Sequence, residues 1–227
     1  MRKTVEKLLF LAVTGVMLLS ACGSQSSGEA SQLPDNLIAL PVVRQGTGYT
    51  CGVACAQSIL YYNGIDFRED NLAQELGSTP EDGTNIDRII SFLNEVTPED
   101  GWWLGLGTEF SDGIGAEKRE DMTLEELCAA IDEGKPVICC IQAWYGESGY
   151  DYTDEWECGH YVIAIGYDEE NIYFMDPSTL GNYTYIEREE FLTRWHDSAN
   201  GVICNHMGIV ITNPNPVFSA DQVLPME

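Results

Sequence analysis

Four polar residues stand in an order that suits catalysis by a thiol nucleophile. Cys51 follows Gln45 by six positions, and His160 and Asp176 come far downstream, in the motifs Gly-His-Tyr-Val and Asp-Pro-Ser. In such chemistry a thiolate attacks a carbonyl carbon, a histidine moves the proton, and a carboxylate orients the imidazole. A side-chain amide and a backbone N–H can then stabilise the oxyanion. We therefore predict the nucleophile, general acid/base, orienting carboxylate and oxyanion donor to be Cys51, His160, Asp176 and Gln45, respectively.

Each of these residues also has a purely structural interpretation. A cysteine near a helix start is commonly a small core residue, and a histidine can simply begin a strand. Asp-Pro-Ser is a common start of a turn, and a glutamine in a loop is commonly exposed. The catalytic interpretation is favoured because His160, unlike His196 and His206, stands in a Gly-His strand start that is followed by Asp-Pro.

Periodicity and chain breakers predict the elements that must position these residues. Apolar residues at helical spacing are followed by glycine, or preceded by Thr84 or by the capping-box pair Thr123 and Glu126. We expect helices over 51–62, 71–76, 84–95, 123–134 and 187–195. We expect strands over 136–144, 160–167, 171–175, 183–186 and 207–212. Most helices precede the strands, and residues 168–171 look like a hairpin turn, so the predicted fold class is α+β with an antiparallel sheet.

These elements would bring the polar residues together. Cys51 falls in the first turn of its helix, where the helix dipole favours a thiolate. Gly52 removes a side chain where a substrate backbone would have to approach closely. His160 begins one strand and Asp176 ends the next, across a hairpin, so the carboxylate can orient the imidazole.

The same motifs resemble those of a known family. They are Gln45 with Thr50-Cys51-Gly52-Val53-Ala54, Gly83-Thr84 before a helix, the run from Gly159 to Asp168, and Asp176-Pro177-Ser178. Together they look like the bacteriocin-processing, or double-glycine, cysteine peptidases and their stand-alone relatives. The resemblance implies a papain-like fold, with an N-terminal helical half packed on an antiparallel sheet, and the four catalytic roles given above. Whether a Gly-Gly cleavage site is preferred stays open.

The N-terminal segment has the composition of a targeting signal. Met1-Arg2-Lys3 is cationic, the following apolar run is too short to span a membrane, and Leu19-Ser20-Ala21-Cys22 resembles a bacterial lipoprotein cleavage box. We predict a signal peptide over 1–21, a flexible tether with lipidated Cys22 over 22–37, a peptidase-like domain over 38–213 and a C-terminal tail over 214–227. An ordinary signal peptide is the alternative. Lipidation would anchor the domain outside the cytoplasm, on the bacterial cell membrane.

The charge is strongly one-sided. The chain has 11 basic and 37 acidic residues, a formal net charge of −26. Such a surface argues against nucleic acid and against anionic headgroups as partners. It would attract cationic peptides, although the charge can equally serve only solubility. The predicted partners are a peptide or protein substrate and, through the lipid, the membrane; the protein is expected to be a monomer.

The remaining cysteines give weaker signals. Apart from Cys22 and Cys51 they are Cys55, Cys128, Cys139, Cys140, Cys158 and Cys204. A bridge from Cys158 to Cys204 or Cys128 is the one to look for. No spacing matches a zinc site, and Asp151, Asp154 and Glu155 lack the EF-hand pattern for calcium. We expect neither a metal nor a cofactor.

The segment 145–157, directly before the Gly-His motif, combines acids with aromatic residues. It either lies on the rim of the cleft and selects substrate or is a solvated loop. Weaker candidates for substrate binding are Gly52, Gly159, Trp144 and Trp156. Trp102, Trp103 and Trp195 are expected in the core.

Together these features predict a membrane-anchored, extracytoplasmic cysteine peptidase that cleaves peptide bonds through a Cys-His-Asp triad. A thiol acyltransferase or amidase could use the same residues. A catalytically inactive peptide-binding lipoprotein is the alternative from another class. A solute-binding lipoprotein fits less well, because a single domain of this size lacks two lobes.

Overall fold

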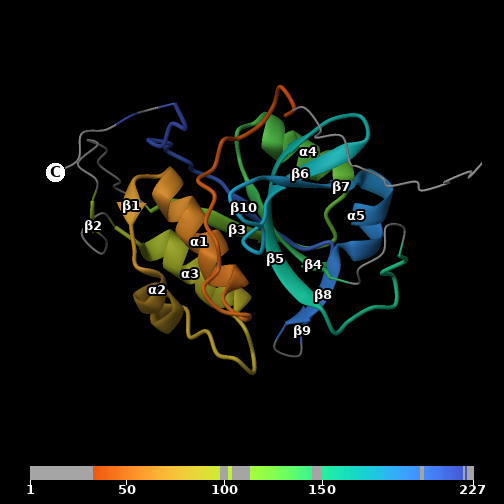
Figure 1. The fold of residues 1–227 in the computed structure, drawn as a ribbon, viewed down its shortest axis with the longest axis horizontal. Coiled ribbons are helices and arrows are strands. Elements are labelled where there is room, and N and C mark those ends of the chain that lie inside the picture. Colours follow the sequence, from red (N-terminus) through yellow and green to blue (C-terminus); the bar gives the residue numbers. More distant parts are fainter. Residues whose placement is uncertain are drawn as a thin grey trace, which may run out of the picture. The chain divides into compact units, whose positions relative to one another are not determined.

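A computed structural model describes residues 33–97, 102–103, 113–144, 150–199, 202–221 and 223 of the chain. The predicted signal peptide and Cys22 lie outside the described residues. Residues 33–227 form one compact unit, which begins with three helices (Figure 1). They are α1 (Cys51–Tyr62), α2 (Glu69–Glu75) and α3 (Ile86–Glu95).

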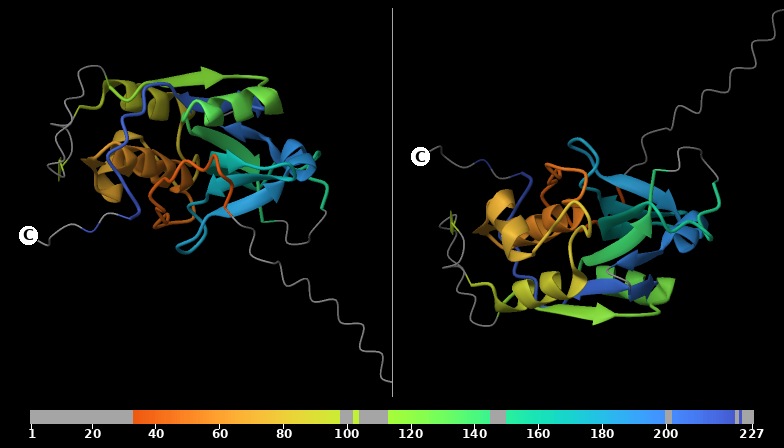
Figure 2. Two further views of the ribbon diagram at one scale, coloured as in Figure 1. Left: turned by 90° about the horizontal axis from the view of Figure 1, so that it is seen from above. Right: turned by 90° about the horizontal axis from the view of Figure 1, so that it is seen from below.

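The second half is built on a six-stranded antiparallel sheet in the order β3-β10-β4-β5-β6-β7. Two further views show its green to blue strands beside the orange helices of the first half (Figure 2). Its strands are β3 (Ala116–Arg119), β4 (Val137–Gln142), β5 (Gly159–Tyr167), β6 (Asn171–Met175), β7 (Thr184–Glu187) and β10 (Gly208–Ile211). Two further helices, α4 (Leu124–Asp132) and α5 (Arg188–Arg194), belong to this half. The two small antiparallel pairs are β1 (Ile65–Asp66) with β2 (Trp102–Trp103), and β8 (His196–Ala199) with β9 (Val202–Asn205). The predicted α+β class is confirmed.

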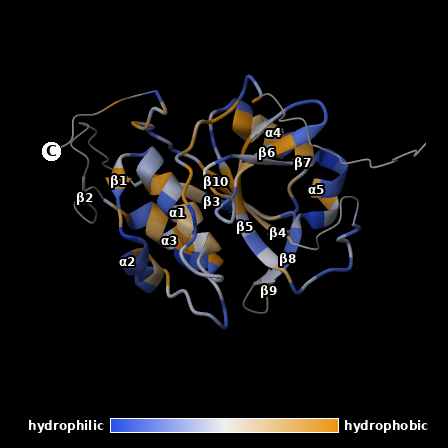
Figure 3. Cartoon of the chain, viewed as in Figure 1, coloured by the Kyte–Doolittle hydropathy of each residue, from blue (hydrophilic) through white to orange (hydrophobic). Residues whose placement is uncertain are grey.

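The core lies where the two halves meet. Helix α1 packs against β5 and is flanked by α2 and α3. All its residues except Tyr61 are buried, because a helix that is apolar over most of its surface has to be enclosed. The hydrophobic colouring accordingly gathers on α1, α3 and the central strands (Figure 3). Helix α1, which begins with Cys51, therefore lies against the strand that contains His160.

Most predicted elements agree with the structure, and the differences have local causes. The capping box of Thr123 and Glu126 is formed. Helix α3 is capped by Asn85, whose Oδ1 accepts from Arg88 N at 3.1 Å, and not by the predicted Thr84. Thr84 is buried, and its hydroxyl lies 2.8 Å from the Ser78 hydroxyl.

Five strands were not predicted from periodicity: β1, β2, β3, β8 and β9. Strand β3 has the sequence Ala-Glu-Lys-Arg, which shows no apolar alternation, and it forms by pairing with β10. Strands β8 and β9 form a hairpin in which several side chains are polar or exposed. Pairing partners decide these strands, and partners are not visible in a local pattern.

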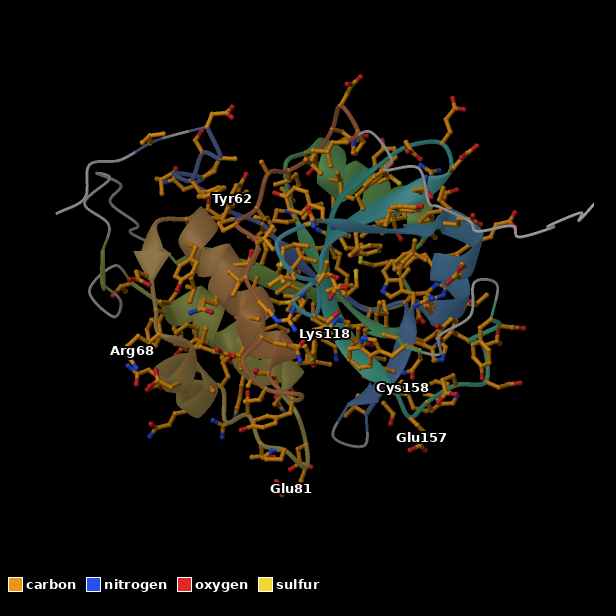
Figure 4. All side chains as sticks on the ribbon, in the orientation of Figure 1. Tyr62, Arg68, Glu81, Lys118, Glu157 and Cys158 are labelled. Carbon is orange, nitrogen blue, oxygen red and sulfur yellow. The ribbon has the colours of Figure 1, made fainter. Side chains whose placement is uncertain are left out.

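Both ends of the described domain are tied to it. Ile38 N donates to Ile165 O of β5 at 2.7 Å. At the other end Val217 N donates to Tyr62 O at 3.0 Å, where α1 ends (Figure 4). Among the described residues, no helix has the length and apolarity needed to cross a membrane.

Candidate active site

The predicted nucleophile opens the central helix. Cys51 is the first residue of α1 and is 8% exposed. Thr50 precedes it at the N-cap position, but the Thr50 side chain makes no capping hydrogen bond. The N–H groups of the first turn therefore lack a side-chain acceptor from the cap, and their partial positive charge faces the region around the thiol.

His160 and Asp176 form a hydrogen-bonded pair next to this helix end. His160 is 2% exposed, and its Nε2 lies 2.8 Å from Asp176 Oδ1. The other ring nitrogen, Nδ1, is buried and in hydrogen-bond geometry with no described group. The carboxylate thus fixes the ring through one nitrogen and leaves the other for the neighbouring thiol.

Electrostatics keep this pair charged. Burial lowers the pKa of His160. The hydrogen bond to Asp176 and the neighbouring Cys51 thiol raise this pKa by more than burial lowers it, to about 9. Burial raises the pKa of Asp176, but the bond from His160 and two bonds from Ser178 lower it to about 2. An imidazolium beside a thiolate is the charge state that a thiol nucleophile needs near neutral pH.

The turn that follows β6 locks the carboxylate. Asp176 Oδ1 accepts from Ser178 N and from Ser178 Oγ, both at 2.8 Å, and Oδ2 accepts from Thr179 Oγ1 at 3.0 Å. The turn-forming and orienting interpretations of Asp176 are therefore compatible. Ser178 and Thr179 are supporting residues to which the sequence pattern assigned no role.

The hydrogen bond between His160 and Asp176 predicts how the pH dependence of peptide hydrolysis changes when Asp176 is replaced. In Asp176→Asn the amide lacks the negative charge that stabilises the imidazolium, so the pKa of His160 should fall from about 9 towards its ordinary value. The protonated ring is then lost at lower pH. We expect the alkaline limb of kcat/KM for peptide hydrolysis to move down by about one to two pH units. Asp154→Asn, which removes an exposed carboxylate, should leave the limb in place; an unmoved limb in Asp176→Asn would contradict the assigned role.

Gln45 lies on the loop that leads into α1. Its backbone N donates to Pro177 O at 3.0 Å, which ties this loop to the turn carrying Asp176. Its side-chain Nε2 donates to Thr47 O at 2.7 Å, while Oε1 is buried and has no hydrogen-bond partner in the part of the chain that the structure describes. An amide nitrogen carries two hydrogens, so the second N–H is the one available to an oxyanion.

A cavity adjoins the histidine. It has a volume of about 450 Å³, and His160, Asp176, Trp144, Tyr185, Glu187 and Arg194 are among its lining residues. The Trp144 ring centroid lies 4.6 Å from that of His160, and Trp144 has a φ of +64°. A side chain rarely adopts this backbone region without a local reason. Trp144 here covers the imidazole, and its 55% exposure leaves an aromatic surface at the cavity.

The other weak candidates for substrate binding have structural surroundings of their own. A Cβ on Gly52 would lie 2.7 Å from Thr84 Cβ, so Thr84 is a close neighbour of Gly52. A Cβ on Gly159 would collide with the Asp197 carboxylate. Trp156 packs on the His196 ring at 4.5 Å between centroids. Of the four, Trp144 alone lines the cavity beside His160.

The remaining expectations concern cysteines, metals and tryptophans. The seven cysteines in the described part of the chain form no disulfide with one another, so the bridge from Cys158 to Cys204 or Cys128 is not formed there. The described residues also hold no group of three His, Cys, Asp or Glu side chains suited to a metal ion. Trp195 is fully buried, as predicted. The side chains of Trp102 and Trp103, and residues 145–149, lie outside what the structure describes.

These observations describe a thiol, an imidazole and a carboxylate gathered where a helix meets an antiparallel sheet. The chain matches the Peptidase_C39 like family over residues 37–202. It therefore belongs to that family, and the family expected from the Gln/Cys and Gly-His motifs is confirmed. A comparison with curated protein sequences found no match.

The solved structures that are similar to this chain include the following two. One is a double glycine motif protease from an AMS/PCAT transporter, in complex with the leader peptide: 18% identity, 81% of this chain and 97% of that chain covered, TM-score 0.49. The other is the peptidase domain of Streptococcus ComA, a bifunctional ABC transporter involved in quorum sensing: 17% identity, 76% and 96% covered, TM-score 0.49.

Proposed function

We propose that this protein is a cysteine peptidase that acts outside the cytoplasm while anchored to the membrane. Membership of the Peptidase_C39 like family supports the peptidase class. The observation that carries the catalytic assignment is the His160 ring. One nitrogen is held by Asp176 at 2.8 Å, and the other is buried with no hydrogen-bond partner among the described residues, in a ring that neighbours Cys51.

The proposed reaction has two halves. The Cys51 thiolate attacks the carbonyl carbon of a peptide bond, and the oxyanion accepts hydrogen bonds from Cys51 N–H and the Gln45 amide. His160 gives its Nδ1 proton to the leaving amine as the C–N bond breaks, which leaves a thioester. His160 then takes a proton from water, hydroxide adds to the thioester, and release of the acid restores the thiolate and the imidazolium.

Peptide cleavage can be tested directly with the folded domain, residues 33–227. A mixed peptide library is incubated with the protein and analysed by mass spectrometry, and a second sample is first alkylated with iodoacetamide. New peptide termini that appear only without alkylation would support a thiol peptidase. Acyl transfer to an added amine in place of water would indicate the transferase alternative. Binding without any covalent change would indicate the inactive peptide-binding alternative.

The membrane anchor is a separate part of the proposal and rests on sequence alone. Leu19-Ser20-Ala21-Cys22 is followed by a Gly/Ser-rich stretch, which suits a lipidated cysteine and a flexible tether. We expect Cys22→Ala to move the protein from the membrane fraction to the soluble fraction and to abolish labelling by a clickable fatty acid. Cys158→Ala should change neither. If Cys22→Ala stays in the membrane fraction, lipidation is not the anchor.

A further inference from the structure

A carboxylate outside the predicted site holds the loop between Gln45 and Cys51. Glu69 Oε1 accepts hydrogen bonds from Gly46 N at 2.7 Å and from Thr50 Oγ1 at 2.9 Å. Gly46 directly follows Gln45, and Thr50 directly precedes Cys51. One oxygen atom therefore ties together the two ends of the loop that separates the proposed oxyanion donor from the proposed nucleophile.

The carboxylate is closely fitted to this loop. A Cβ on Gly46 would lie 2.6 Å from Glu69 Oε2, so a larger residue at position 46 would push the carboxylate away. Glu69 is the first residue of α2, which packs on α1. The loop is thus supported by α2, and α2 is itself packed on α1, the helix that begins with Cys51.

The charge of Glu69 is directed at the loop. No Lys, Arg or His side chain in the described part of the chain forms an ion pair with it; the adjacent Arg68 pairs with Asp70 at 2.8 Å. Arg68 lies at the outer edge of the helical half (Figure 4). The two loop donors therefore make charge-assisted hydrogen bonds, which are stronger than neutral ones.

This arrangement changes what Thr50 does. A threonine at the N-cap ordinarily accepts from an N–H of the first helical turn, but Thr50 makes no such bond. Its hydroxyl accepts from Thr47 N at 3.2 Å and Thr47 Oγ1 at 3.1 Å, and it donates to Glu69. One donor and two acceptor sites are then in use. The Thr50 hydroxyl therefore accepts no hydrogen bond from the N–H groups of the first turn of α1.

We propose that Glu69 is a positioning residue for the oxyanion site. The inference rests on the proposed peptidase function. Glu69 touches neither the substrate nor the reacting atoms in this scheme. It holds the Thr50 hydroxyl away from the helix end and fixes Gly46, and with it Gln45, relative to Cys51. Without Glu69 the hydroxyl is free to accept from Gly52 N–H or Val53 N–H, the positions at which an N-cap side chain bonds, and Gly46 is no longer fixed relative to Cys51.

Two reactions of Cys51 separate positioning of the oxyanion donors from activation of the thiol. Acylation by p-nitrophenyl acetate passes through a tetrahedral oxyanion, whereas alkylation by iodoacetamide does not. We expect Glu69→Ala to slow acylation at least about tenfold, less than the roughly 100- to 1000-fold loss of a donor itself. Alkylation should stay within about twofold of the wild-type rate.

Further variants show whether the effect belongs to this carboxylate. Glu69→Gln keeps a carbonyl oxygen that can accept both loop hydrogen bonds, so it should restore most of the acylation rate. Glu75→Ala removes an exposed charge from the same helix and should have no effect. If Glu69→Ala does not fold, Gly46→Ala tests the same contact by displacing the carboxylate. Gly48→Ala is its control, since a Cβ there meets nothing within 4 Å.

The outcomes are distinct. Slower acylation with unchanged alkylation in Glu69→Ala or Gly46→Ala supports the inference. Unchanged acylation, or acylation and alkylation that slow together, would overturn it while the peptidase proposal stands. A wild-type protein whose Cys51 is alkylated rapidly but is never acylated would overturn the peptidase proposal, and the inference with it.

Discussion

Replacing Cys51 with alanine is expected to abolish peptide hydrolysis. No other described thiol is placed at the first turn of α1 beside His160, so no group can replace the nucleophile. Loss of a nucleophile that acts together with its base can cost up to about 10⁶-fold in kcat. The measurement is single-turnover cleavage of a peptide found with the wild-type protein, at matched concentrations of enzyme.

Cys55→Ala is the matched control. Cys55 lies one helical turn further along α1 and is fully buried, and burial raises the pKa of its thiol well above the ordinary value. A buried neutral thiol is a poor nucleophile, so this variant should cleave at close to the wild-type rate. Equal loss of activity in both variants would mean that helix packing, and not the Cys51 thiolate, was disturbed. Cleavage that survives Cys51→Ala would refute the assigned nucleophile.

Replacing His160 with alanine is expected to have the second largest effect. The ring supplies the proton for the leaving amine and, as an imidazolium with a pKa raised to about 9, stabilises the thiolate. We expect a loss of roughly 10⁴-fold or more in kcat/KM. The pH dependence of Cys51 alkylation gives a second measurement: in the wild type Cys51 should react faster than the other thiols well below pH 8, and His160→Ala should lose this advantage.

A control for this variant uses another histidine of the same half. His206 stacks on Trp195 at 5.0 Å between ring centroids and has a φ of +44°. Asparagine tolerates such a backbone, so His206→Asn should keep both the cleavage and the fast alkylation. If Cys51 alkylates as an ordinary thiol in the wild type and in both variants, the thiolate–imidazolium pair does not exist. The cavity beside His160 would then be examined as a peptide-binding site.

Local pattern was sufficient to predict most of the elements. The extent of helix α1 is close to the prediction because apolar residues at helical spacing start near Cys51 and end before Gly64. The capping box at Thr123 can also be predicted from the local sequence, because its two partners are only three residues apart. The cap of α3 is Asn85 and not the predicted Thr84, because Thr84 is held elsewhere, by Ser78 and the core. Propensity describes neighbours along the chain and not those across it.

The order of the amino acids is enough to specify the residue types that can do the chemistry, their spacing, and the helix and strands that carry them. Cys51, His160 and Asp176 stand in short motifs whose meaning is local, and family membership follows from those motifs. The tertiary structure decided what surrounds them. Trp144 covers His160, and Glu69 holds the loop before Cys51, through contacts across 16 to 23 residues of chain. Such contacts depend on how elements pack, and no periodicity in the sequence records them.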